Sequence, residues 1–290
     1  MNTASLNTAV AFIRAALLAG SLLGLNSCLP ESLEVRSVPE AEVQIVVSSQ
    51  IIPDQSLVIF PTRTFGALDA SDSSDPETLL ALIAVNDAIV TVLGPEGTDT
   101  LSFLGDGAYG GVPIAFAAGD QYQLYVRSEE LGEVSASTVV QSRIGFSSIG
   151  AELFYNGFSD TLAQITYSFD DSPEKNYYMI NVQEVEQEDL VDNLLNPRAF
   201  TVLMDDAGFN GQTYSERFRV FPRDYGPGDT IAVSLSNIHE DYYEFMKLRI
   251  DNRFSIVEFV SEPVNYPSNV IGGKGYFNLY VPDVRFFVFD

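Results

Sequence analysis

Short runs of β-branched and aromatic residues, separated by turn signals about every ten residues, fill this chain from Val43 onward. Turns are indicated by Pro53-Asp54, by Gly-Pro-Glu-Gly at 94–97 and by the glycine-rich residues 105–111. Strands this short bury one face when two sheets stack, so the pattern predicts an immunoglobulin-like β-sandwich over residues 43–147. The strand candidates are 43–47, 57–60, 86–93, 100–104 and 121–126.

The same pattern continues after residues 145–150, which we interpret as a hinge, and predicts a second β-rich domain over residues 148–290. Asn237 with Glu240 three residues later favours a capped helix, with Ile238 and Tyr242 on its apolar face. The chain is therefore expected to be all-β, with one short helix in the second domain. The strand candidates are 161–169, 176–182, 199–204, 213–221 and 230–235.

The first residues have the form of a secretory signal, with one positive charge at Arg14 and an apolar run over 15–25. An apolar helix of that length rises about 16 Å, roughly half of the hydrocarbon core of a bilayer. We therefore expect residues 1–27 to be a removable signal peptide.

Cys28 is the single cysteine of the chain, and Leu25-Asn26-Ser27-Cys28 resembles the cleavage site of bacterial lipoproteins. In such signals the cysteine sulfur takes a diacylglyceryl group, and each buried methylene contributes about 0.8 kcal/mol to membrane binding. We expect Cys28 to be acylated and to anchor the protein to a bilayer. The other interpretation is an ordinary secreted protein with a free thiol near the cut.

Residues 28–42 contain Pro30, Pro39 and four glutamates, a composition that favours a tether between the anchor and the body. Acidic residues just after a lipidated cysteine resemble the surface-export signals of Bacteroidota lipoproteins. This resemblance implies an outer-membrane protein, with the cell surface favoured over the periplasmic face.

The chain has 15 basic and 40 acidic residues, for a formal net charge of −25. This charge repels nucleic-acid backbones and anionic lipid headgroups, so neither is expected as a partner. We interpret the acidic residues mainly as solvated surface, with the loop at 69–76 as one example, followed by a helical turn at 79–82.

The sequence contains few combinations of residues that are typical of a catalytic site. His239 is the single histidine, and it lacks the second histidine of a metalloprotease helix. Gly145-Phe-Ser-Ser-Ile149 departs from the serine nucleophile elbow at its last position. Asp205-Asp206 with Asn210 can hold a cation, although a turn beside a strand explains them as well. We therefore expect no catalytic residue, no metal and no cofactor.

The end of the chain resembles a known family. Residues 262–277, EPVNYPSNVIGGKGYF, are similar to the C-terminal signature of the Bacteroidota lipoproteins grouped as domain of unknown function 4249. Weaker motifs agree in order: 87–92, 107–109, 119–122, 209–211 and 238–245. The signature itself is explained by a clasp on the second domain or by a loop that contacts a partner.

The resemblance implies a lipid-anchored envelope protein encoded beside TonB-dependent outer-membrane receptors, and it supplies no catalytic residues. We expect a non-enzymatic accessory that contacts the receptor barrel in nutrient capture. The alternative is a structural or adhesive surface module without a transport role. A calcium-dependent glycan-processing enzyme is a third class. The ligand is not indicated by the sequence.

Overall fold

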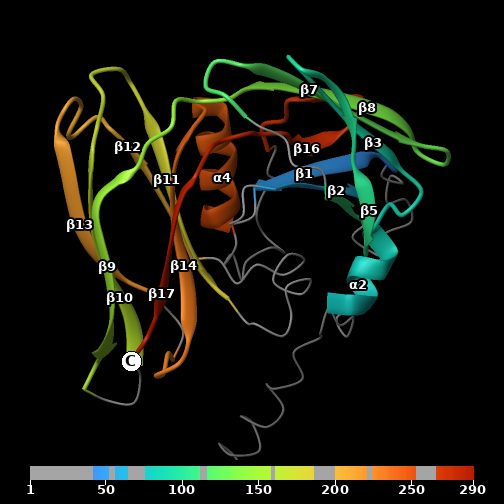
Figure 1. Cartoon of the computed structure of the whole chain (residues 1–290). Coiled ribbons are helices and arrows are strands. Elements are labelled where there is room, and N and C mark those ends of the chain that lie inside the picture. Colours follow the sequence, from blue (N-terminus) through green and yellow to red (C-terminus); the bar gives the residue numbers. More distant parts are fainter. Residues whose placement is uncertain are drawn as a thin grey trace, which may run out of the picture. The chain divides into compact units, whose positions relative to one another are not determined.

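The computed structural model describes residues 42–51, 56–64, 76–111, 116–157, 161–185, 200–220, 224–252 and 266–290. Residues 41–290 form one compact unit. The protein is mainly β, which confirms the predicted fold class, and Figure 1 shows its strands in several sheets. Two helices lie in the described part, α2 (Pro76–Ile83) and α4 (Glu240–Asn252).

The first sandwich consists of two five-stranded sheets that share one hydrophobic core. Sheet A has the order β16-β1-β2-β6-β5, and sheet B has the order β15-β8-β7-β3-β4. The strands of sheet A are β1 (Ile45–Ile51), β2 (Leu57–Arg63), β5 (Ser102–Gly105), β6 (Ala108–Gly110) and β16 (Lys274–Tyr276). Those of sheet B are β3 (Ile89–Gly94), β4 (Gly97–Thr100), β7 (Gln121–Ser128), β8 (Gly132–Val139) and β15 (Val270–Ile271).

Side-chain alternation explains how these strands face the core. In β7, Tyr122, Leu124 and Val126 are buried while the residues between them are more exposed. The β5–β6 hairpin turns at Asp106 and Gly107, whose φ angles are 48° and 76°. Asp-Gly is a favoured pair for such a two-residue turn. The turn predicted at 105–111 is therefore confirmed only at 106–107, because residues 108–110 form strand β6.

The end of the chain returns to the first sandwich. Strand β16 pairs in parallel with β1, and β15 pairs with β8. Both strands lie inside the range 148–290 that the sequence suggested for the second domain. By their pairing, however, they belong to the first sandwich. Strand order along the chain could not show this, because the pairing joins residues more than a hundred positions apart.

The second sandwich consists of sheet C, β13-β10-β9, and sheet D, β12-β11-β14-β17, which share a second core. In Figure 1 β9, β10 and β13 lie side by side. The strands of sheet C are β9 (Phe146–Tyr155), β10 (Thr161–Asp170) and β13 (Thr213–Arg219). Those of sheet D are β11 (Tyr177–Glu184), β12 (Phe200–Asp205), β14 (Thr230–Ile238) and β17 (Asp283–Val288).

The predicted hinge at 145–150 is wrong for most of its length. Strand β9 begins at Phe146 and pairs with β10 from its first residue. Phe146 and Ile149 pack against the second core, so these residues already belong to the sandwich. Ser147, Ser148 and Gly150 made the segment look like a linker, whereas they are exposed residues of a strand.

The predicted cap of the second helix is also wrong. Asn237 lies in β14, and its Nδ2 donates to Oδ1 of Asn176 at 3.0 Å and to Oγ of Ser142 at 3.0 Å. His239 precedes the helix instead: its carbonyl accepts from the N–H of Tyr243 at 2.9 Å. Its Nδ1 accepts from the N–H of Asp241 at 3.2 Å, which satisfies an otherwise unpaired first-turn donor.

Helix α4 joins the two sandwiches through aromatic contacts. Tyr242 lies 5.4 Å from Tyr276 of β16, and Tyr243 lies 4.9 Å from Tyr177 of β11, measured between ring centroids. All four rings belong to the first hydrophobic core, together with Met179 of sheet D. The helix thus fixes sheet D against the first sandwich through buried contacts.

Several predictions concern residues outside the described ranges. These are the signal peptide 1–27, the acylated Cys28, the tether up to residue 41, the turn at Pro53-Asp54, most of the loop at 69–76 and the first residues of the C-terminal signature, 262–265. No helix in the described part of the chain is long and apolar enough to cross a bilayer.

Candidate functional site

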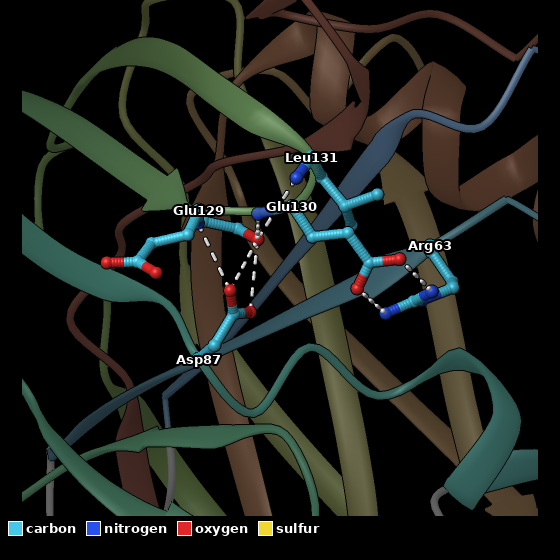
Figure 2. Close-up of polar contacts among 6 residues, drawn as sticks. Arg63, Asp87, Glu129, Glu130 and Leu131 are labelled. Atoms are coloured by element: carbon cyan, nitrogen blue, oxygen red, sulfur yellow. Dashed lines mark hydrogen bonds and ion pairs between the residues drawn. The ribbon is translucent and has the colours of Figure 1, made fainter.

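A polar cluster at the β7–β8 turn brings together residues far apart in the sequence (Figure 2). Ser128 is buried, and its hydroxyl donates to the carboxylate of Asp87 at 2.9 Å. The same oxygen accepts from the N–H groups of Glu130 and Leu131, each at 3.2 Å. One donor and two acceptor positions are all that a hydroxyl has, so Ser128 is fully used inside the protein.

The rest of this cluster ties the turn to sheet A. The guanidinium of Arg63 in β2 makes two hydrogen bonds to the carboxylate of Glu130, both 3.1 Å (Figure 2). Asp87 also accepts from the N–H of Glu129 at 3.1 Å. The cluster therefore fixes a hairpin end of sheet B to β2 and to the segment before β3, which is a structural role.

The pKa of Asp87 reflects the same contacts. Desolvation raises it, but the hydrogen bonds from Ser128 and from the backbone N–H groups outweigh this and leave the pKa below the usual value. The carboxylate is thus ionised and already hydrogen-bonded, and it offers little capacity for another ligand.

The predicted candidate at Asp205, Asp206 and Asn210 resolves into a turn after β12. Asp206 is buried, and its carboxylate accepts from the N–H of Asn176 at 2.6 Å. Asp205 accepts from the N–H of Ala207 at 3.1 Å, while Asn210 is exposed. Among the described residues no group of three histidines, cysteines or acids is placed to hold a metal ion.

A neighbouring buried carboxylate was not singled out by its sequence. Asp171 accepts from the hydroxyl of Tyr178 and, at 2.7 Å, from the N–H of Gly211. Burial, followed by this hydrogen bond, raises the pKa of Tyr178 well above its usual value. Tyr178, seven positions later in the sequence, is only a weak signal for a buried carboxylate, because only the folded sheet brings its hydroxyl to Asp171.

The two residues considered for nucleophilic catalysis lie apart in the fold. Ser147 is in β9, and its hydroxyl donates to Asp170 at 2.7 Å. His239 comes immediately before α4, and its imidazole accepts from the backbone N–H of Asp241. Ser147 and His239 do not contact each other, so the structure does not bring them together as a nucleophile and its base.

The C-terminal signature forms a clasp, and it acts on the first sandwich rather than the second. The side-chain amide of Asn269 bonds to the backbone of Phe277 as a neighbouring strand would. Its oxygen accepts from the N–H of Phe277 at 2.9 Å, and its nitrogen donates to the carbonyl oxygen of Phe277 at 2.7 Å. Ser49 of β1 does the same for Asn278, at 2.8 Å and 3.0 Å. A side chain on Gly275 would lie 2.0 Å from the carbonyl oxygen of Val47, so the clasp needs glycine there.

The outer face of sheet C carries an open polar ladder. Two of its rows consist of hydrogen-bonded side chains from neighbouring strands, Glu152–Gln164–Arg219 and Thr166–Arg217. The guanidinium of Arg219 also stacks 3.5 Å from the ring centroid of Phe154. In contrast to the clusters above, this face is largely exposed to solvent, and it carries Arg217 and Arg219 together with Glu152.

Comparison with known proteins adds one decisive match. The model of the family described as Domain of unknown function (DUF4249) matches residues 33–284. The chain belongs to this family. The match includes the first sandwich, the clasp and the second sandwich up to the start of β17, and it confirms the resemblance to this family.

The remaining comparisons give this DUF4249 member no functional assignment. No curated protein matches it. A solved structure, the selenomethionine form of the chicken interferon gamma receptor alpha chain, matches at 13% identity with a TM-score of 0.20. The match covers 69% of this chain and 90% of that chain, but at this TM-score the likeness carries no argument.

Proposed function

We propose that this DUF4249 member is a lipid-anchored, non-enzymatic envelope protein that binds a TonB-dependent outer-membrane transporter and assists nutrient capture. The observation that carries the proposal is the single cysteine, Cys28, placed after an apolar signal-like run in the sequence Leu25-Asn26-Ser27-Cys28. An acylated cysteine would hold the body next to integral membrane proteins, where a binding partner is always within reach.

The body supports a binding role rather than turnover. The polar clusters at Asp87, Asp171 and Asp206 use protein partners for their carboxylates. The two sandwiches are fixed to each other by the aromatic contacts of α4. Two rigidly joined sandwiches, with their inner carboxylates hydrogen-bonded within the protein and with exposed strand faces, are suited to recognition of another protein.

The anchor is tested by replacing Cys28. In Cys28→Ser the thiol is lost, so we expect no acyl chains on the mature N-terminus by mass spectrometry and transfer of the protein out of the membrane fraction. Ser27→Ala is the matched control, because it keeps a small residue before the cysteine, and it should fractionate like the natural protein. Membrane retention of Cys28→Ser would contradict the anchor.

The partner is tested by purifying the tagged chain from native membranes in mild detergent. A receptor barrel should co-purify in a fixed ratio, and Cys28→Ser should recover at most about one tenth as much. Recovery of the chain without a barrel would overturn the transporter role. If deletion of the gene also altered surface assembly and left nutrient uptake unchanged, the structural or adhesive role would replace it.

A further inference from the structure

Strand β13 lies at one edge of sheet C. It pairs with β10 on one side, and no other described strand pairs with it. The strand has seven residues, and most of them are exposed. An open edge of this length presents unpaired backbone groups to solvent, which is a template for another strand.

The pairing with β10 shows which backbone groups are unpaired. The N–H of Val220 donates to the carbonyl of Ala163 at 3.0 Å, and the N–H of Asp171 donates to that of Gln212 at 3.1 Å. Directly bonded pairs alternate along an antiparallel ladder, so the backbone groups of Ser215, Arg217 and Arg219 point away from β10.

Two of these residues, Arg217 and Arg219, are positively charged. Arg217 and Arg219 lie on the outer face, and each donates its Nε to a β10 side chain at 3.1 Å, Arg217 to Thr166 and Arg219 to Gln164. Neither forms an ion pair among the described residues. Within the described part of the chain their terminal nitrogens are therefore able to bind a carboxylate.

The partner's chemistry follows from this register. A strand added to β13 would place alternate side chains beside Arg217 and Arg219, two residues apart on one face. Acidic residues at those positions would pair with both arginines. A second copy of β13 would bring arginine against arginine, so self-pairing is disfavoured.

We propose that β13 binds an extended segment of a partner protein that carries two acidic residues separated by one position, by adding it as a fourth strand of sheet C. This inference goes beyond the proposed function, because it specifies an edge and a peptide chemistry and does not require the lipid anchor. Long-range repulsion from the acidic chain is largely screened beyond about 8 Å at physiological salt.

The test uses two labelled peptides of equal composition and the purified full chain in detergent at physiological salt. The peptide acetyl-TVEVEVT-amide has alternating glutamates, and acetyl-TVVEEVT-amide has adjacent ones, which point to opposite faces of a strand. We expect the alternating peptide to bind at least about tenfold more tightly by fluorescence anisotropy. It should also slow amide hydrogen exchange at Ser215 and Arg217.

Three variants test the arginine charge, the outward backbone N–H groups and a control position away from this edge. Arg217→Glu should weaken binding of the alternating peptide by about tenfold and favour a peptide with lysines in place of glutamates. Ser215→Pro removes an outward N–H without touching the pairing to β10 and should also abolish binding. Arg127→Glu, which changes an exposed arginine on the inner strand β7, should leave binding unchanged.

Equal affinity for the two peptides, or unchanged exchange at Ser215 and Arg217, would overturn the proposal. The arginines would then serve only to prevent edge pairing. A failure of the transporter pull-down would not affect these measurements, so the two proposals can fail separately.

Discussion

The two sandwiches differ in whether their edge strands are covered by other strands. In the first, β1 and β8 are covered by β16 and β15, short strands from the end of the chain, and the opposite edge strands β4 and β5 have four residues each. In the second, no described strand covers either edge of sheet C. These edges are β13 with seven residues, two of them arginines, and β9 with ten. Covered edges stabilise a sheet and prevent unwanted pairing, whereas an open charged edge adds little stability and can select a partner.

The largest expected effect concerns the clasp that covers the first sandwich. Gly275→Ala would place a Cβ 2.0 Å from the carbonyl oxygen of Val47, at a φ of +94°. We expect a loss of about 3–5 kcal/mol in the free energy of unfolding, measured by circular dichroism in urea.

The matched control for this variant is Gly119→Ala. Its φ is +87°, but nothing lies within 4 Å of the new Cβ. Only the backbone strain remains, so a loss of about 1–2 kcal/mol is expected. Equal losses for the two variants would show that the close approach of β16 to β1 is unimportant.

A smaller effect is expected at the base of the clasp. Asn269→Ala removes both hydrogen bonds to the backbone of Phe277, a residue with no exposed surface. Leaving those groups buried without partners should cost about 2–3 kcal/mol in urea unfolding. Ser268→Ala, which loses one bond at an exposed position, should cost about 0.5 kcal/mol. A loss at Asn269 no larger than this would refute the strand-like role of its amide.

The hairpin cluster of the first sandwich should show a pH-dependent contribution. Because the folded-state pKa of Asp87 is lowered, its contribution is present above the unfolded pKa of about 3.9 and is lost as the pH falls through the folded value. Since the carboxylate is mostly exposed, the contribution should be at most about 1 kcal/mol.

The measurement compares urea unfolding of the natural chain and Asp87→Asn between pH 3 and pH 7. The difference in stability should be constant near neutral pH and shrink below about pH 4. Ser128→Ala in the Asp87→Asn background should have a smaller effect than alone, because the two side chains act together. A difference that does not change with pH would contradict the assignment.

The smallest effect is expected at the open edge. Arg217 is exposed, and Arg217→Glu should change the free energy of unfolding by no more than about 0.5 kcal/mol. Arg219 stacks on Phe154, so Arg219→Glu should cost about 1 kcal/mol. A loss above about 1 kcal/mol at Arg217 would mean that this edge stabilises the sheet, and the contrast between the sandwiches would disappear.

The sequence predicted much of the local structure. The alternation of β7, a turn within 105–111 and the strand predicted over 161–169, which runs over Thr161–Asp170, all follow from residues close together in the chain. Strand β8 was missed, because its small hydroxyl residues and Ala136 resemble a loop until their pairing with β7 is seen. The capping role of His239 was missed because an asparagine two positions earlier fitted the usual pattern better.

By itself, the sequence determined the all-β class, most strand positions, family membership and the cysteine on which the anchor proposal rests. These depend on side-chain period, turn chemistry and local motifs. Only the tertiary structure decided that the final segment closes the first sandwich, that Asp87 meets Ser128, and that β13 is an open edge. The reason is physical. Pairing between distant strands depends on which of their faces are buried together, and the residues next to a strand in the sequence do not show which strand it will pair with.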